Sequence, residues 1–201
     1  MENEQLSKEE QLRKDIISTA QKLFQQYGLQ KTTMEDIARA MGKGKSTLYY
    51  YYKSKEEIFD AVLRCEMDEV YKASKIAVQQ ADTASEKLKA YFSVSFQKAK
   101  SKANLYNIVK EGMALEDISR AHHITKEMNE KSVAMIEDIF IAGFVSGEFC
   151  EELREQAHLL SYSMVSAMRS LVLDMAIESP IPDWDTRLNL LLDYLIKALR
   201  K

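Results

Sequence analysis

The sequence predicts an all-α protein, in which an N-terminal helix-turn-helix domain of three helices precedes a larger helical bundle, with about nine helices in total. Two observations support this fold class. Only 2 prolines and 6 glycines occur in 201 residues, so few positions interrupt a helix. Apolar residues recur at helical spacing along most of the chain, and the alternation typical of strands is absent. We place the two domains at residues 8–68 and 69–201.

Two capping boxes define the first helices. Ser7 and Glu10 have the spacing of a capping box, and Gly28 closes the apolar pattern that follows. Thr33 and Asp36 have the same spacing, so a second helix should begin there. The segment before Gly28 is therefore predicted as a helix of about five turns that supports the shorter helices after it.

A glycine turn separates the second helix from a short third one. Gly42 supplies the positive φ that ends the second helix, and the third begins near Lys45 after Gly44. Leu48 and Tyr52 are four positions apart and share the core face of the third helix. Its outer faces carry cationic or hydrogen-bonding side chains: Lys45, Ser46, Thr47, Tyr49 and Tyr50.

Positive charge is concentrated at this turn, although the chain as a whole has a formal net charge of −3. Every charged residue between positions 43 and 55 is a lysine: Lys43, Lys45, Lys53 and Lys55. Lysines neutralise phosphates, and hydroxyl and amine groups reach base edges. These features predict a DNA-binding helix-turn-helix, and a helical hairpin with a solvated lysine face is the alternative.

The later elements follow from apolar spacing and turn residues. Ser54 and Glu57 form a third capping box, which predicts a fourth helix through about Lys72. We expect breaks at 81–85 and 102–104, a helix between them and a short helix over 105–113. The polar residues 116–123 should form a loop or a loosely packed turn, and a helix should follow from 125 to 147. Gly143 and Gly147 should mark the end of that last helix.

The last two helices are predicted at 151–178, the longest uninterrupted one, and 183–200, with Pro180 and Pro182 between them. They are apolar on more than one face. Such helices need partners on both sides, and the same pair of helices from a second copy of the chain would supply them.

The N-terminal residues resemble the TetR family of bacterial transcriptional regulators. The resemblance covers about the first third of the chain and is carried by these residues: Ile16, Ile17, Ala20, Leu23, Phe24, Tyr27, Gly28, Thr33, Asp36, Ile37, Ala38, Gly42, Thr47, Leu48, Tyr49, Lys55, Glu56, Glu57 and Ile58. It implies a two-fold dimer, a double-stranded operator and a ligand cavity in the C-terminal body.

The resemblance also implies roles for single residues. Thr33, Tyr49 and Lys55 would touch phosphates. The residues that would face the major groove are Lys45, Ser46, Thr47 and Tyr50. Two positions depart from the family pattern, because Lys43 replaces an aliphatic residue and Gly44 replaces a capping serine. We expect Lys43 to reach a phosphate instead.

Methionine and aromatic side chains follow the helix-turn-helix and offer adaptable walls for a small apolar or amphipathic ligand. The candidate pocket residues are Phe92, Phe96, Tyr106, Met113, Met128, Met135, Phe140, Tyr162, Met164 and Met168. For each residue taken singly, an ordinary place in the core is the alternative.

The sequence predicts no catalytic residues, no cofactor and no metal. Phosphate loops, nucleophile elbows and metalloprotease motifs are absent. Glu155 and His158 form one Glu-x-x-His pair, but a di-iron site needs two, so a ferritin-like enzyme is a distant third hypothesis. No apolar run approaches the ~18 residues of a membrane span, so we expect a cytoplasmic protein without a membrane partner.

We therefore predict a ligand-responsive regulator: a repressor that binds a palindromic operator as a homodimer through its last two helices and is released by a small molecule. The alternative is a helical ligand-binding or protein-interaction module without DNA binding, which only Lys43 and Gly44 favour.

Overall fold

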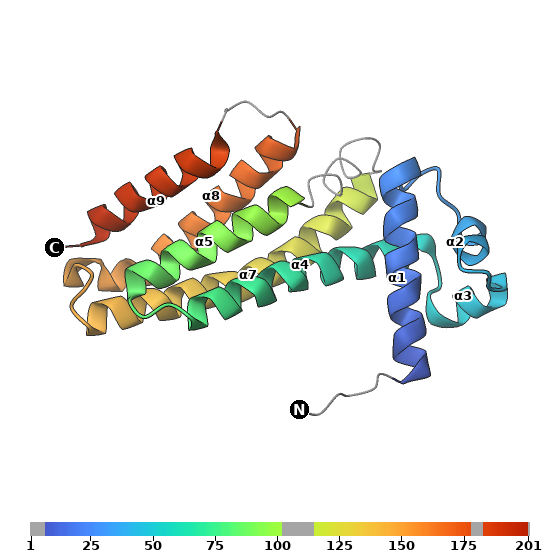
Figure 1. The fold of residues 1–201 in the computed structure, drawn as a ribbon, viewed down its shortest axis with the longest axis horizontal. Coiled ribbons are helices and arrows are strands. Elements are labelled where there is room, and N and C mark those ends of the chain that lie inside the picture. The colour runs from blue at the N-terminus through green and yellow to red at the C-terminus, as the bar shows by residue number, and fades with distance from the viewer. Residues whose placement is uncertain (1–6, 102–114, 178–182, 201) are drawn as a thin grey trace. The chain divides into compact units, whose positions relative to one another are not determined.

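The computed structural model describes residues 7–101, 115–177 and 183–200, and the regular elements in these ranges are all helical (Figure 1). They are α1 (Lys8–Tyr27), α2 (Met34–Ala40), α3 (Lys45–Tyr51), α4 (Lys55–Gln79), α5 (Ala84–Ser101), α7 (Leu115–Val145), the 3-10 helix η1 (Glu151–Gln156), α8 (Ala157–Ile177) and α9 (Trp184–Leu199). The predicted all-α fold class is confirmed. The short helix predicted over 105–113 lies outside the described residues.

The chain divides into two units. The first consists of Met1–Glu66 with Asn107–Ile124, and the second of Met67–Tyr106 with Thr125–Lys201. Helices α4 and α7 each contribute residues to both units. The domain boundary that we placed between residues 68 and 69 stays a prediction.

The first unit is built around α1. Its capping box is present, because the Glu10 N–H donates to Ser7 Oγ at 3.2 Å and the Ser7 N–H donates to the Glu10 carboxylate at 2.9 Å. Gly28 ends the helix with φ 83°, as predicted. Phe24 is fully buried and meets Phe59 of α4 edge to face, with 5.7 Å between ring centroids. This aromatic contact holds α1 against α4.

Helix α4 is longer than predicted, because it ends at Gln79 rather than near Lys72. No glycine or proline occurs between these positions, so nothing stops the helix. At its start the Glu57 N–H donates to Ser54 Oγ at 3.3 Å, while the Glu57 carboxylate accepts from the Lys53 N–H at 2.6 Å. The carboxylate thus reaches one residue further back than in a regular capping box.

The prediction of a loop or a loosely packed turn over 116–123 is wrong, because these residues form the start of α7. The segment is polar, yet no glycine or proline occurs from Leu115 to Ala142. A polar surface is compatible with a helix when breakers are absent. Gly143 also differs from prediction, since it lies inside α7, whereas Gly147 has φ 74° in the turn that follows.

The segment predicted as one helix over 151–178 is divided into η1 and α8. No residue of η1 is buried, and four of its six side chains are charged. A short exposed segment has no packing that would favour α-helical geometry, and 3-10 turns are frequent at the start of α-helices. Helix α7, with 31 residues, is the longest of the described helices.

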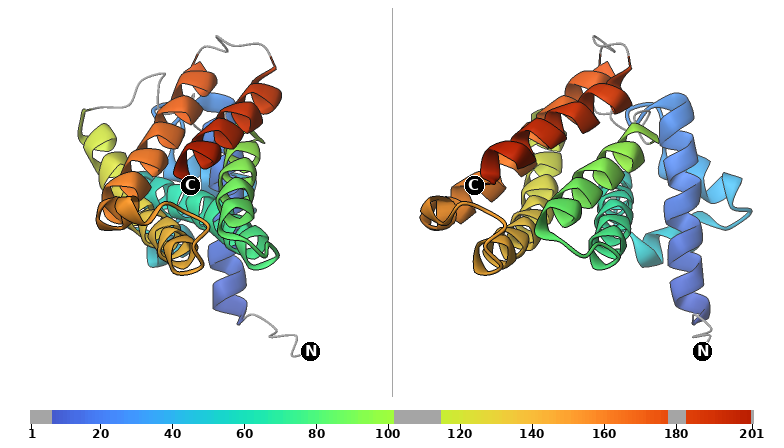
Figure 2. Two further views of the ribbon diagram at one scale, coloured as in Figure 1. Left: turned by 90° about the vertical axis from the view of Figure 1, so that its left-hand side faces the viewer. Right: turned by 60° about the vertical axis from the view of Figure 1, so that its left-hand side comes forward.

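In the second unit α5 packs against α8 and α9, and Figures 1 and 2 show α9 running alongside α5. Polar contacts follow this seam in antiparallel order: Ser93 to Asn189 at 3.1 Å, Lys89 to Asp193 at 2.7 Å and Ser85 to Arg200 at 3.3 Å. The spacing of four residues on α5 places all three of its side chains on one face. These contacts between α5 and α9 therefore fix which face of α9 lies toward the core.

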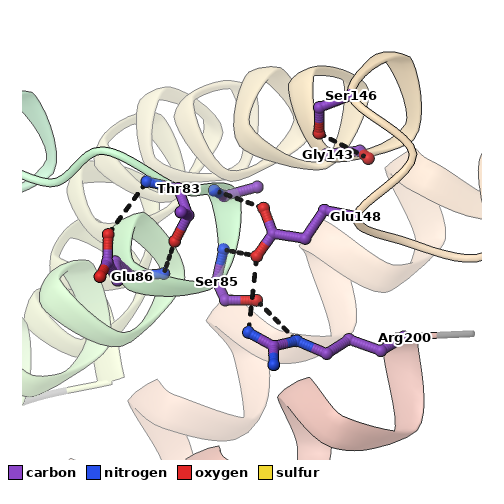
Figure 3. Close-up of polar contacts among 8 residues, drawn as sticks. Thr83, Ser85, Glu86, Gly143, Ser146, Glu148 and Arg200 are labelled. Atoms are coloured by element: carbon purple, nitrogen blue, oxygen red, sulfur yellow. Dashed lines mark hydrogen bonds and ion pairs between the residues drawn. The ribbon is translucent and has the colours of Figure 1, made fainter.

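Glu148, in the turn after α7, caps the start of α5 (Figure 3). Its carboxylate accepts from the backbone N–H groups of Ala84 at 2.8 Å and Ser85 at 3.0 Å, and Arg200 lies 3.6 Å away. Burial raises the pKa of Glu148, but the hydrogen bonds from Ser85 and Ala84 and the Arg200 charge outweigh this, so the pKa lies below its ordinary value of 4.5.

We expect Glu148→Gln to lower the free energy of unfolding by about 1 kcal/mol at pH 7, the typical contribution of a helix cap. Because the folded state lowers this pKa, the stabilisation is complete above pH 4.5 and disappears as the pH falls through the folded value. Urea unfolding of both proteins from pH 7 to pH 3 measures this. A difference that stayed constant over this range would contradict the assigned role of the Glu148 charge.

Candidate nucleic-acid interface

Helix α2 begins with the predicted capping box. The Asp36 N–H donates to Thr33 Oγ1 at 3.2 Å, and the Asp36 carboxylate accepts from the Thr33 hydroxyl at 2.6 Å and the Thr33 N–H at 3.1 Å. These hydrogen bonds lower the pKa of Asp36. The Thr33 hydroxyl is exposed but already donates within the cap.

The turn between α2 and α3 is a Schellman motif. The Gly42 N–H donates to the Arg39 carbonyl oxygen and the Lys43 N–H donates to that of Ala38, both at 3.0 Å. Gly42 has φ 63°, which favours glycine, whereas the backbone of Gly44, at φ −70° and ψ 149°, suits any residue. As predicted, Gly44 provides no side-chain cap, and α3 nevertheless begins at Lys45.

Helix α3 presents three rows of polar side chains. Leu48 is fully buried, so the row of Ser46 and Tyr50, about 160–180° away around the helix, points most directly outward. Tyr50 is accordingly 73% exposed. The row of Lys45 and Tyr49 flanks it on one side, and Thr47 lies half-buried on the other. Hydroxyl and ammonium groups thus cover one surface of a helix short enough to enter a major groove.

Arg13 of α1 contacts the end of α3, which sequence reasoning missed. Its guanidinium carbon lies 5.1 Å from the ring centroid of Tyr51 and 5.9 Å from that of Tyr52. Such cation–π contacts join α1 to α3 and help to fix the angle at which α3 is presented. Arginine and tyrosine separated by almost 40 residues give no signal in the sequence.

Glu35 was also missed. Its carboxylate forms an ion pair with the Lys45 ammonium, which links the first turn of α2 to the first residue of α3. The same ammonium lies 5.6 Å from the ring centroid of Tyr49. Lys45 is therefore held between a carboxylate and an aromatic ring.

Lys55 is engaged by the protein itself, and its predicted phosphate contact stays a prediction. Its ammonium donates to three backbone oxygens of the turn between α1 and α2, those of Leu29 at 2.9 Å and of Gln30 and Thr32 at 3.2 Å. An ammonium has three N–H donors, so Lys55 would have to give up one of these contacts to bind a phosphate. Lys55 holds the start of α4 against this turn. Its spacing in the sequence could not reveal carbonyl partners more than 20 residues away.

The structure brings some of the candidate pocket residues together. Phe92, Phe96, Phe140 and Met168 belong to one buried cluster in the second unit, and Met135 and Met164 pack against it. Met128 is buried as well. Tyr162 does not join them, because it is 57% exposed on α8. Tyr106 and Met113 lie outside the described residues.

His158 pairs with Glu137 of α7, with 2.8 Å between Nδ1 and Oε2. Within the described ranges no group of three histidine, cysteine or acidic residues could hold a metal ion. None of the helices in those ranges combines the length and apolar character that crossing a membrane requires.

Two family models match the chain. Residues 16–62 match "Bacterial regulatory proteins, tetR family", and residues 66–195 match "QacR-like protein, C-terminal region". Together they span the helix-turn-helix described above and most of the second unit. The chain belongs to the TetR family. It is a DNA-binding transcriptional regulator.

Similar proteins support this assignment to the TetR family. The uncharacterized HTH-type transcriptional regulator YhgD of Bacillus subtilis is 24% identical over 189 residues, which cover 93% of this chain and 96% of YhgD. The HTH-type transcriptional repressor KstR2 of Mycolicibacterium smegmatis is 28% identical over 142 residues, covering 70% and 69%. The structure of FadR from Bacillus subtilis in complex with stearoyl-CoA matches with a TM-score of 0.67 and 22% identity over 94% and 97% of the two chains.

These relatives are transcriptional regulators, which agrees with the prediction that this chain is not an enzyme. The alternative of a module without DNA binding gains no support, because it depended on Lys43 and Gly44. Both residues fit into a regular turn, and α3 follows it directly.

Proposed function

We propose that this TetR-family protein is a cytoplasmic repressor that binds a palindromic operator as a homodimer and leaves it when a small apolar or amphipathic ligand occupies its second unit. The observation that carries the proposal is the polar surface of α3, which follows a regular helix-turn-helix and opposes a fully buried Leu48.

We assign different DNA contacts to the different rows of side chains on α3. Ser46, Tyr50 and Thr47 are proposed to read base edges in the major groove, together with Lys45. Tyr49, at the margin of this surface, and the exposed Lys43 are proposed to touch phosphates, which positions the helix without reading sequence. Thr33, whose hydroxyl and N–H both donate to Asp36, is proposed to support these contacts by starting α2. Lys55 supports these contacts through the turn that it holds.

The dimer is proposed to form through α8 and α9. On α9, Leu188, Leu192, Ile196 and Leu199 are buried in the core, while another set of large apolar residues is exposed: Leu190, Leu191, Tyr194 and Leu195. On α8, Leu159 and Tyr162 are exposed too. A second copy presenting the same face would bury these side chains and set two α3 helices at the half-site spacing of a palindrome.

The ligand is proposed to be apolar or amphipathic because aromatic rings and thioethers make up part of the core of the second unit. Phe92, Phe96, Phe140 and Met168 share one cluster, and flexible Met135 and Met164 border it. That FadR of Bacillus subtilis has a structure with stearoyl-CoA supports this class of ligand. Binding there would favour a conformation in which the two α3 helices no longer match the operator.

Selection of bound duplexes from a random library with the purified protein tests operator binding. A palindromic consensus is the expected result, and recovery of unrelated sequences would contradict the proposal. The consensus then serves as the probe for titrations with fatty acids and acyl-CoA thioesters of increasing chain length. At least one of these ligands should release the DNA if the ligand class is correct.

Substitutions on α3 should separate affinity from specificity. We expect Tyr49→Ala to weaken binding to every duplex by about fivefold, the effect of one lost phosphate contact. We expect Thr47→Ala to lower discrimination at one base pair by about tenfold. Fluorescence anisotropy with the consensus and with single-base variants measures both effects. Tyr27→Ala, at an exposed tyrosine of α1, is the control and should leave both quantities unchanged.

A further inference from the structure

Glu35 places a negative charge on the surface that we assign to DNA. It is the second residue of α2, and its partner Lys45 is the first residue of α3. Their side chains remain 51% and 52% exposed, so both groups are accessible to a duplex. The neighbouring Asp36 differs, because its carboxylate is occupied by the Thr33 cap and by Arg39.

A carboxylate at this place opposes the sequence-independent part of DNA binding. Phosphates attract lysines on any duplex, and each neutralised phosphate adds to affinity without adding information. Proteins that discriminate between partners often include a repulsive group for this reason. Lys45 can approach a phosphate only by leaving Glu35 or by bringing the carboxylate with it.

The ion pair affects base edges differently. The Lys45 ammonium carries three N–H donors and its pair with Glu35 uses only part of them. The O6 and N7 atoms of guanine are uncharged acceptors in the major groove, so they can accept from a lysine whose charge is already balanced. The Tyr49 ring, at 5.6 Å, limits the directions that the flexible lysine side chain can take.

From this geometry we infer that Glu35 is a specificity-determining residue, which acts by positioning Lys45: it holds Lys45 for base edges and reduces its attraction to phosphates. The inference rests on the proposed DNA-binding function and adds to it a residue outside the recognition helix. It also explains why a carboxylate pairs with Lys45 at the start of a stretch whose charged residues, from position 43 to 55, are all lysines.

The test compares Glu35→Gln with wild-type protein on two duplexes, the selected consensus and an unrelated sequence, over a series of salt concentrations. Asp68→Asn is the matched control, because Asp68 forms an exposed ion pair with Lys72 on α4 at 2.6 Å and its loss changes the net charge equally. Circular dichroism of each variant establishes that its helices are intact.

We expect Glu35→Gln to bind the unrelated duplex about three- to fivefold more tightly, the upper part of the range for an exposed ion pair. Its plot of log affinity against log salt should steepen by about 0.9, since Lys45 then neutralises one more phosphate. Preference at one base pair of the consensus should fall by a similar factor. Asp68→Asn should change none of these quantities.

The double variant Glu35→Gln/Lys45→Ala decides whether Glu35 acts through Lys45. Relative to Lys45→Ala alone, the double variant should show neither the steeper salt dependence nor the lower base preference that Glu35→Gln causes in the wild-type background. Persistence of the steeper salt dependence would overturn the inference in favour of direct repulsion, and unchanged binding by Glu35→Gln would overturn it altogether. Failure of wild-type protein to select any consensus would instead contradict the proposed function.

Discussion

Leu191→Asp is expected to convert the homodimer into monomers and to lower operator affinity at least 100-fold. Leu191 is 46% exposed on α9 and flanks the row of its buried core residues, so its side chain contributes less to the core than theirs. In the proposed dimer it is buried against the second copy, and an unpaired carboxylate there costs several kcal/mol. The loss of affinity is large because a dimer that binds two linked half-sites has an affinity about 10²–10⁴ times that of a monomer on one half-site.

Sedimentation velocity measures the mass of the protein, and anisotropy on the selected consensus measures its affinity. Ile76→Asp is the control, because Ile76 is 56% exposed on α4, outside the proposed dimer face. The control should remain dimeric and bind DNA normally. A dimeric Leu191→Asp protein would show that the apolar face of α9 serves another purpose.

Gly143→Ala is expected to lower the free energy of unfolding by about 3 kcal/mol, the upper part of the range for overpacked cores. A methyl group at this position would lie 2.2 Å from Cδ2 and 2.4 Å from Cε2 of Phe149, and 3.0 Å from Cβ of Ala84. Phe149 is 1% exposed and packs against Phe140 and Phe144, so its ring has no free space to occupy. In an ordinary helix the same change stabilises by about 0.5–1 kcal/mol.

Urea unfolding and thermal melting measure this effect, and a protein of this size should lose about 6–12 °C in melting temperature. Phe149→Leu in the Gly143→Ala background should restore part of the stability, because the smaller side chain leaves room. Gly44→Ser is the contrasting glycine variant, since the position has ordinary backbone angles and a new cap should stabilise by a few tenths of a kcal/mol. An unchanged Gly143→Ala protein would contradict the close packing of Phe149.

The helices of the first unit were predictable because their signals are local. The capping boxes of Ser7 and Thr33 satisfy backbone N–H groups within three residues, and Gly42 adopts the one conformation that ends α2 in a Schellman turn. Errors arose where local patterns lack a decisive residue. Polar residues 116–123 lack a breaker and stay helical, whereas the equally uninterrupted segment after residue 150 begins as a 3-10 helix because it buries nothing.

The candidate site was predictable as a surface but not as a set of contacts. Helical spacing alone assigns Ser46 and Tyr50 to the outside of α3 once Leu48 is placed in the core. It does not show that Lys45 meets Glu35, that Arg13 meets Tyr51 or that Lys55 is occupied by three carbonyl oxygens. These partners are 10 to 38 residues apart, and they come together only when α1, α2 and the start of α4 fold around α3.

The sequence by itself determined the helix-turn-helix, its turn glycine and the outward side chains of α3, because capping and helical periodicity act within one or two turns of chain. Only the tertiary structure decided which of the lysines have partners within the protein and why a side chain at position 143 would collide with Phe149. The physical reason is that these features depend on segments distant in the sequence. A distant segment supplies the partner of a long lysine side chain, and a distant segment fills the space beside a glycine.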